Sequence, residues 1–128
     1  MPLSTVQRRI RRLVGSGFVR PTFEIDYSKF GLKRGMVHLY LNGGNAYALA
    51  QKIAGMVGII SVVVYIGNSD IIADYVAASG EDLLEMLTQV KKLPDVSRVI
   101  WSEQVTSIPT GMTIASILVS KPDKSSLI

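Results

Sequence analysis

The chain contains no cysteine among its 128 residues, which excludes disulfides, thiolate metal sites and thiol nucleophiles. It contains one histidine, His38, and no Asp, Glu or Ser stands at a recognisable catalytic spacing from it. We therefore expect a structural or surface role for His38. Sequence patterns typical of phosphate-binding loops, zinc proteases and serine hydrolases are absent as well. These absences predict a non-enzymatic protein with no catalytic residue, no metal site and no cofactor.

Long hydrophobic runs are also missing. The longest run, Met56 to Gly67, has about 12 residues, whereas a helix needs about 20 to cross a bilayer. No signal peptide opens the chain, so we expect a cytoplasmic protein without membrane contact. Apolar residues nevertheless make up 48% of the chain. This share is high for a small monomer, and we expect partner subunits to cover some of that surface.

Charge is distributed unevenly along the chain. Residues 1–34 hold eight basic and two acidic side chains, a net charge of +6, whereas the remainder holds six basic and eight acidic ones, a net charge of −2. A basic end joined to a nearly neutral body is typical of proteins that bind a polyanion. The alternative interpretation is a solvated charged face, because four arginines on one helix are not rare.

The basic end centres on an amphipathic helix that we predict at residues 4–14. Apolar side chains recur along one stripe at helical spacing, and arginines occupy the opposite face. Ser4 and Gln7 have the spacing of a capping box, and Gly15 and Gly17 supply the positive φ that ends a helix. Small polar residues in the first turn suit base edges, and arginines suit phosphates or guanine. The residues predicted to bind double-stranded DNA are Ser4, Thr5, Gln7, Arg8, Arg9, Arg11 and Arg12, with Arg20 adding to the phosphate contacts.

Residues 18–27 alternate between apolar and polar side chains, which predicts a half-buried strand, and Pro21 within it favours an edge position. We predict a domain boundary near residue 32. Beyond it, the patterns predict a strand at 36–41, a helix at 45–54, strands at 59–66 and 71–78, a helix that Ser79 caps and Leu93 ends, and a strand at 96–106. The β-branched run at 59–66 indicates a central strand buried on both faces.

The predicted fold class is α+β. The order of elements is βαββαβ, and right-handed crossovers turn it into a four-stranded antiparallel sheet with both helices on one face, the ferredoxin-like sandwich. The other face of this sheet needs a partner sheet, which predicts a dimer. A further strand is predicted at 112–119, followed by a flexible tail at 120–128.

Two sets of segments carry a family resemblance. The beginning of the chain resembles the recognition helix and exit strand of the Lrp/AsnC (feast/famine) transcription regulators, and the rest is similar to the ligand-responsive (RAM-type) domain of that family. No single piece is specific, but the ordered set covers residues 3–106. The matching pieces are Leu3-Ser4-Thr5-Val6-Gln7-Arg8-Arg9-Ile10, Leu13, Gly17-Phe18-Val19, Tyr27, Gly31, Val57 to Val62, Gly67-Asn68-Ser69-Asp70, Ser79-Gly80-Glu81-Asp82-Leu83 and Leu93-Pro94-Asp95-Val96.

The resemblance implies a DNA-binding transcription regulator that forms dimers, often assembled into tetramers or octamers, and responds to an amino acid or a related small molecule. It implies that residues 1–31 are a partial helix-turn-helix with its connecting strand, and that residues 32–119 sense the ligand and form the oligomer. It places the effector between subunits at the hairpin turn, on Gly67, Asn68, Ser69 and Asp70. In that arrangement Gly67 permits close approach and Asp70 pairs with a ligand ammonium. A plain hairpin turn is the alternative interpretation.

The sequence departs from the family pattern in two places. Ser69 stands where the family has an aromatic residue. The family also carries two helices ahead of the recognition helix, which complete the helix-turn-helix and cover its apolar stripe. We therefore keep an alternative function, a ligand-sensing and oligomerisation module without independent DNA binding that acts through mixed oligomers with full-length relatives.

Overall fold

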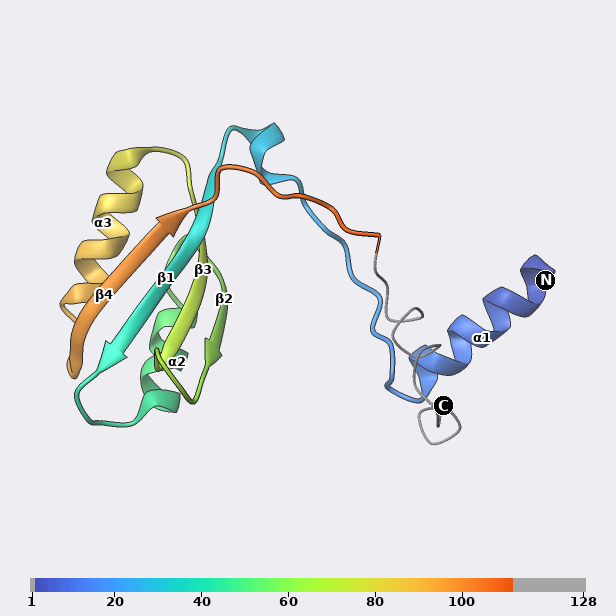
Figure 1. Ribbon diagram of the computed structural model, residues 1–128, viewed down its shortest axis with the longest axis horizontal. Helices are drawn as coiled ribbons and strands as arrows, with labels where there is room; N and C mark the ends of the chain where they lie inside the picture. Colours follow the sequence, from blue (N-terminus) through green and yellow to red (C-terminus); the bar gives the residue numbers. More distant parts are fainter. Residues whose placement is uncertain (1, 112–128) are drawn as a thin grey trace. The chain divides into compact units, whose positions relative to one another are not determined.

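The structure is a computed structural model that describes residues 2–111. The chain divides into two units, Asp26–Ser107 on the one hand and Met1–Ile25 with Ile108–Ile128 on the other. We call Asp26–Ser107 the sheet unit; it begins a few residues before the boundary predicted near residue 32. The strand predicted at 112–119 and the tail predicted at 120–128 lie outside the described residues. The elements in chain order are α1 (Leu3–Gly15), the 3-10 helix η1 (Tyr27–Phe30), β1 (Lys33–Leu41), α2 (Ala46–Ala54), β2 (Ile59–Val64), β3 (Ile71–Ala77), α3 (Gly80–Lys91) and β4 (Val96–Glu103) (Figure 1).

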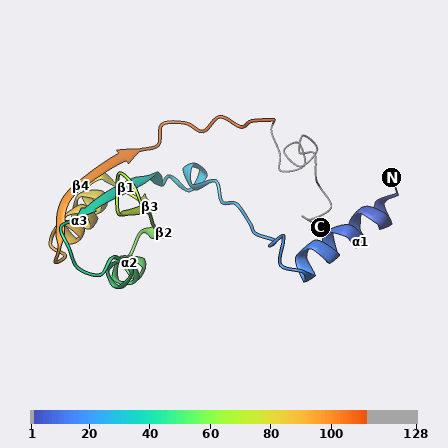
Figure 2. The same cartoon turned by 60° about the horizontal axis from the view of Figure 1, so that its bottom comes forward.

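The four strands of the sheet unit form one antiparallel sheet in the order β2-β3-β1-β4. In the middle of the sheet, Val37 of β1 lies opposite Ala73 of β3 on one side and Trp101 of β4 on the other. Both α2 and α3 pack on the same face of the sheet (Figure 2). Neither of them covers the other face, which we call the open face. The predicted α+β, ferredoxin-like βαββαβ fold is therefore confirmed.

The core lies between the sheet and the two helices. Residues Ile71, Ala73, Tyr75 and Ala77 of β3 are buried, and the residues between them are only partly buried. This alternation arises because successive side chains of a strand point to opposite faces, and one face meets the helices. The buried helix residues recur at helical spacing. They are Leu49, Ala50 and Ile53 of α2 and Leu83, Met86, Leu87 and Val90 of α3.

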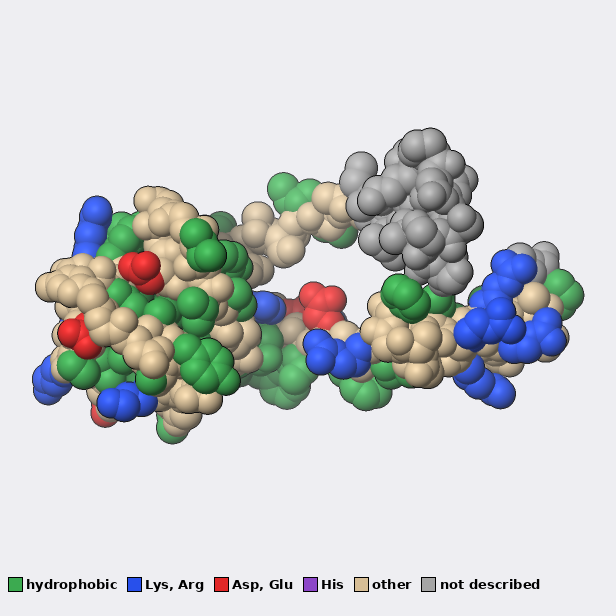
Figure 3. Space-filling model, turned by 90° about the horizontal axis from the view of Figure 1, so that it is seen from below, with side chains coloured by type: hydrophobic (Ala, Val, Ile, Leu, Met, Phe, Trp, Pro, Cys, Tyr) green, Lys and Arg blue, Asp and Glu red, His purple; other side chains and the backbone are tan. Residues whose placement is uncertain are grey.

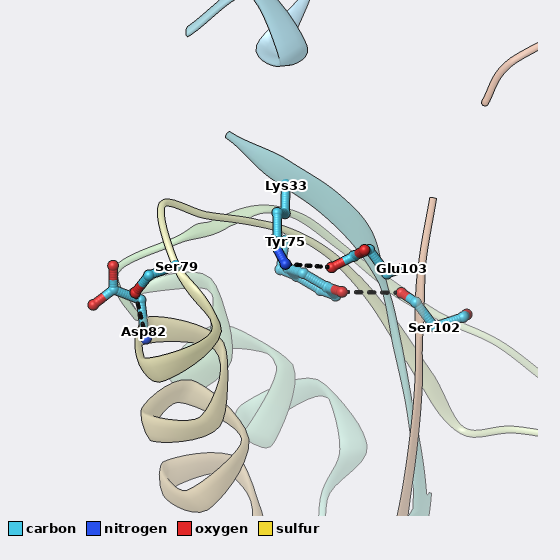
Figure 4. A network of polar contacts seen from close by, with 6 residues as sticks. All are labelled: Lys33, Tyr75, Ser79, Asp82, Ser102 and Glu103. Carbon is cyan, nitrogen blue, oxygen red and sulfur yellow. Dashed lines mark hydrogen bonds and ion pairs between the residues drawn. The ribbon is translucent and has the colours of Figure 1, made fainter. Parts of the chain in front are cut away.

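Both helices of the sheet unit begin at a capping side chain. The Asn45 side chain accepts a hydrogen bond from the backbone N–H of Ala48 at 3.1 Å. The Ser79 hydroxyl accepts one from the N–H of Asp82, also at 3.1 Å, as predicted from the sequence (Figure 4). Each bond satisfies an N–H group that the helix itself leaves free. Asp82 also places a negative charge in the first turn of α3, where the helix dipole favours it.

Tyr75 links β3 to β4 across β1 (Figure 4). Its side chain is fully buried, and its hydroxyl donates a hydrogen bond to the backbone oxygen of Ser102 at 3.1 Å. The ring lies against Gly35 of β1, where an added Cβ would be 2.6 Å from the Tyr75 hydroxyl oxygen. Gly35 is therefore needed for this close approach. Burial raises the pKa of the Tyr75 hydroxyl above its usual 10.0, and the negative charge of Glu103 raises it further.

The expectation that residues 59–66 form a central strand is wrong, because β2 is an edge strand of the sheet. Ile59 and Val62 pack against the core, whereas Val63 and Val64 are each 44% exposed. A continuous apolar run shows that both faces of a strand are apolar, but it does not show what covers them. In β2 the run leaves apolar side chains on the surface of the sheet unit.

The strand predicted at residues 18–27 is also wrong. Residues 19–26 have no regular secondary structure, and the chain then enters η1. Alternation of apolar and polar residues gives a strand only where a second strand supplies hydrogen bonds, and no described strand pairs with this segment. Phe23 is accordingly 99% exposed.

The entry into the sheet unit is fixed by local contacts. Asp26 accepts hydrogen bonds from both the N–H and the hydroxyl of Ser28, and these bonds lower the pKa of the Asp26 carboxyl. The guanidinium of Arg34 lies over the ring of Tyr27, 5.4 Å from its centre. Such a cation–aromatic contact is favourable, and together with the backbone bond from Leu32 to Tyr27 it joins η1 to β1.

Candidate functional site

The first candidate site is α1, which confirms the helix predicted at residues 4–14. Its start differs from the prediction, because Pro2 is the N-cap and no side chain caps the helix. The N–H groups of Thr5 and Val6 donate to the backbone oxygen of Pro2 at 3.1 and 3.2 Å. The predicted capping box of Ser4 and Gln7 is therefore wrong, since the helix begins before Ser4 and places it inside the first turn.

The end of α1 follows the prediction more closely. Gly17 has a φ of +83°, the left-handed conformation that glycine adopts without strain. The N–H of Phe18 donates to the oxygen of Leu13, and the N–H of Gly17 donates to the oxygen of Val14. This pair of bonds is the Schellman motif, which satisfies carbonyl groups at the end of a helix. Gly15 is the last residue of the helix, so Gly17 alone supplies the positive φ.

Most of the side chains predicted to bind DNA share one side of α1. At about 100° per residue, six of the seven face away from the apolar stripe, whereas Gln7 lies at its border beside Val14. Figure 3 shows basic side chains along this helix. The four arginines are exposed, and within residues 2–111 none of them forms an ion pair. No acidic residue stands in the first turn, so nothing offsets the positive end of the helix dipole there. The α1 side chains predicted to bind DNA are Ser4, Thr5, Gln7, Arg8, Arg9, Arg11 and Arg12, while Arg20 follows in the segment without regular structure.

The apolar stripe of α1 is largely exposed. None of the helix residues is buried, and Leu3 and Ile10 are 71% and 52% exposed. Exposed apolar surface of this kind marks a site of contact with another element or another molecule. In the described part of its unit, α1 is the only helix, so no second helix of a helix-turn-helix lies beside it there.

The second candidate site is the connection between β2 and β3, which forms the predicted antiparallel hairpin. The N–H of Tyr65 donates to the backbone oxygen of Asp70 at 2.9 Å, so residues 66–69 form the loop. Gly67 has a φ of +139° and, like Asn68, is exposed. Ser69 is only 7% exposed. Of the predicted effector residues, Gly67 and Asn68 therefore lie on the surface, whereas Ser69 is buried.

Asp70 holds the hairpin to the neighbouring strand. Its carboxylate oxygen Oδ2 accepts a hydrogen bond from the N–H of Leu41 at 2.8 Å, and its own N–H donates to the oxygen of Leu39 at 3.1 Å. Asp70 therefore has a structural role at the end of β1. A carboxylate offers about four acceptor positions, so this bond leaves capacity for a ligand donor.

A hollow of about 190 Å³ lies at the same end of the sheet. It is lined by residues of β1, α2 and the loop before β4, among them Leu41, Leu49, Lys52 and Asp95. Leu41 is the residue whose N–H bonds to Asp70, so the hollow and the hairpin are neighbours. The sequence pattern marks Asp95 only as a helix end, and the hollow forms from segments far apart in the chain. Sequence reasoning therefore missed it.

Within residues 2–111, no group of three or more His, Asp or Glu side chains could hold a metal ion. No helix of the same range is both long and apolar enough to cross a membrane.

Comparison with known proteins gives similarity of structure rather than of sequence. No protein-family model matches the sequence, and no curated protein matches it. A transcriptional regulator from Neisseria meningitidis, solved with L-Met, has 14% identity and a TM-score of 0.71, with 86% of this chain and 75% of that chain covered. AsnC from E. coli has 10% identity and a TM-score of 0.69, with 86% and 76% covered. At these identities the likeness shows the fold alone.

A third solved structure matches a smaller part of the chain. It is a protein from Thermus thermophilus with 23% identity and a TM-score of 0.56. The match covers 61% of this chain but 99% of that protein. The matched part therefore makes up almost all of the Thermus protein. The predicted fold is confirmed by these neighbours, one of which is named as a transcriptional regulator.

Proposed function

We propose that this protein, which has the fold of the Lrp/AsnC transcription regulators, is itself a non-enzymatic regulator of that type. It binds double-stranded DNA through α1, forms oligomers through the sheet unit and responds to an amino acid or a related small molecule. The single observation that carries the DNA-binding role is the exposed arginine face of α1, in which four guanidinium groups lack any ion pair within the described residues.

The chemistry of α1 supports contact with a DNA backbone. Phosphate contacts from arginine supply most of the affinity of such proteins and make it depend strongly on salt. The N-terminal end of α1 carries a partial positive charge from the helix dipole, which attracts phosphate groups. Ser4 and Thr5 in its first turn are small enough to let the DNA bases come close. Side-chain contacts with base edges would come from this turn.

The open face of the sheet supports the oligomer. Met36 of β1 and Ile100 of β4 lie on it and are 40% and 37% exposed. His38 stands between Ile72 and Ile100 in the register of the three strands. A sheet face of this composition is stable in water when a second sheet packs on it, and a second copy of the chain offers an identical face.

The effector would bind near the hairpin, where the free acceptor capacity of Asp70 and the adjacent hollow come together. Lys52 and Asp95 give the hollow one charge of each sign, which suits a small molecule with both an ammonium and a carboxylate. The solved complex of the Neisseria regulator with L-Met supports an amino acid as the class of ligand.

A gel-shift titration with a double-stranded fragment from the region upstream of the protein's own gene tests the DNA-binding role. We expect the double variant Arg8→Ala, Arg12→Ala to bind more weakly, and the slope of log affinity against log salt to fall by about 1.8, since each lost phosphate contact contributes about 0.9. The control variant Lys91→Ala, Lys92→Ala removes the same charge at the C-terminal end of α3. Equal binding by the arginine variant and the wild type would contradict the role.

The protein from Thermus supports a second candidate function, because nearly all of it is covered by a match to 61% of this chain. In that case the sheet unit senses a ligand and joins mixed oligomers, and α1 does not bind DNA alone. This candidate predicts no gel shift at about 50 mM salt together with a higher melting temperature in the presence of an amino acid, since ligands that bind the folded state stabilise it.

A further inference from the structure

We propose that the outer edge of β2 is a second assembly surface, at which two copies of the chain join their β2 strands in antiparallel pairing. The proposal goes beyond the oligomer of the proposed function, because it uses the edge of the sheet rather than its open face. The result is one continuous eight-stranded sheet made of two subunits.

The geometry of β2 leaves regular backbone groups at this edge. The register runs without interruption from Ser61 to Val64, and the irregularity of the strand lies before Ser61. The N–H of Tyr65 points to Asp70 on the side of β3. Since alternate residues of an antiparallel strand direct their N–H groups to the same side, the N–H groups of Val62 and Val64 point outward.

The side chains at this edge are apolar and accessible. Val63 and Val64 are each 44% exposed, Tyr65 is 46% exposed, and Ile66 at the hairpin loop is fully exposed. Figure 3, which looks at the sheet unit from below, shows hydrophobic side chains on its surface. An exposed edge of apolar, β-branched residues pairs readily with another strand.

The two edges of the sheet differ in the devices that block such pairing. No charged residue and no proline occurs from Met56 to Ser69, the stretch that contains β2. On the opposite edge, β4 carries Arg98 and Glu103, and Glu103 forms an ion pair with Lys33 at 3.5 Å. Charges on an edge strand are a known protection against strand addition. The sheet unit therefore has one protected edge and one unprotected edge.

This asymmetry identifies the occupant as a second copy of β2. Two-fold pairing brings only neutral side chains opposite one another, and all of them except Ser61 are β-branched, which makes such cross-strand pairs favourable. It also closes the sheet, because the outer edges that remain are the two charged β4 strands. Pairing of β2 with β4 would instead leave a free edge of each kind and continue without limit.

Sedimentation of the full chain tests the proposal with the variant Val64→Lys, which adds a charge beside the outward N–H. We expect the assembly to break down to a dimer where the open face is also paired, and to a monomer where it is not. Val57→Lys is the matched control, because Val57 is 97% exposed and precedes β2, and it should leave the mass unchanged. Val64→Pro removes the same N–H without breaking a bond to β3 and should act like Val64→Lys. An unchanged mass for both Val64 variants overturns the proposal.

A lysine on the open face separates this contact from the dimer of the proposed function. If both contacts exist, Val64→Lys and Ile100→Lys each leave a dimer, and the double variant is a monomer. If only the β2 contact exists, the wild type is a dimer that Ile100→Lys does not affect. Hydrogen exchange of the Val64 N–H distinguishes a second copy from any other cover, because protection by a second copy is lost on dilution. Protection that does not depend on concentration overturns the proposal.

Discussion

Helices α1 and α3 have nearly the same length, 13 and 12 residues, but they differ completely in what they bury. Both have an apolar stripe at helical spacing. α3 buries Leu83, Met86, Leu87 and Val90 against the sheet, whereas α1 buries no residue. The difference teaches that an amphipathic pattern predicts a helix and its apolar side, but not the presence of a surface for that side.

The polar faces of the two helices differ in a related way. α3 begins with a capping serine and two acidic residues, which suit its own backbone and dipole. α1 has no capping side chain and no acid in its first turn, and its polar face carries four arginines. In α3 the charges stabilise the helix itself, whereas the arginines of α1 form no ion pair within residues 2–111.

The largest test of this comparison removes one apolar side chain from each helix. Leu87→Ala in α3 should lower the free energy of unfolding of the sheet unit by about 2–5 kcal/mol, because it leaves a cavity at a site that is 5% exposed. Ile10→Ala in α1 removes a side chain that is 52% exposed and should leave that free energy nearly unchanged. Urea unfolding followed by the fluorescence of Trp101, the chain's single tryptophan, measures both.

A large loss for Ile10→Ala would contradict the comparison. It would show that the stripe of α1 packs on the protein itself, and α1 would then be part of a cooperative core rather than a surface for a partner.

The second test uses the caps and should give a smaller effect. Ser79→Ala removes the hydroxyl that accepts from Asp82, and we expect a loss of about 1 kcal/mol in the free energy of unfolding. Ser4→Ala is the matched change in α1, where the serine lies inside the first turn and caps nothing. Its effect should be close to zero in the same urea titration. Equal losses for the two variants would mean that Ser4 caps α1 and that α1 unfolds together with the sheet unit.

The sequence predicts the elements of the sheet unit well because their signals are local. Asn45 and Ser79 mark helix starts, Gly67 marks a turn, and the side chains of β3 alternate as one buried face requires. Each of these signals depends on neighbours within a few residues. The order of the elements, combined with right-handed crossovers, then fixes the sheet topology.

The errors occur where the outcome depends on a distant partner. Residues 18–27 alternate like a strand but have no strand beside them, and β2 is apolar like a central strand but lies at an edge. The candidate sites divide in the same way. The arginine side of α1 follows from helical spacing, whereas the bond from Asp70 to Leu41 and the hollow near Asp95 join residues far apart in sequence.

The smallest expected effect is a change in the free energy of unfolding at high pH, and it depends on Tyr75 on the covered side of the sheet. The pKa of Tyr75 is raised in the folded state, mainly by burial, so the folded protein holds this proton more tightly than the unfolded chain. Its contribution to stability is therefore complete below pH 10, the ordinary value of the group, and is lost as the pH rises through the folded pKa. Tyr75→Phe lacks this group, and the difference in unfolding free energy between wild type and variant should stay constant up to about pH 9 and shrink above about pH 10. Urea titrations from neutral to strongly alkaline pH measure this difference.

A constant difference throughout would mean that Tyr75 titrates as freely as an exposed tyrosine. The contrast between the covered core and the exposed α1 would then be weaker than the burial of Tyr75 implies.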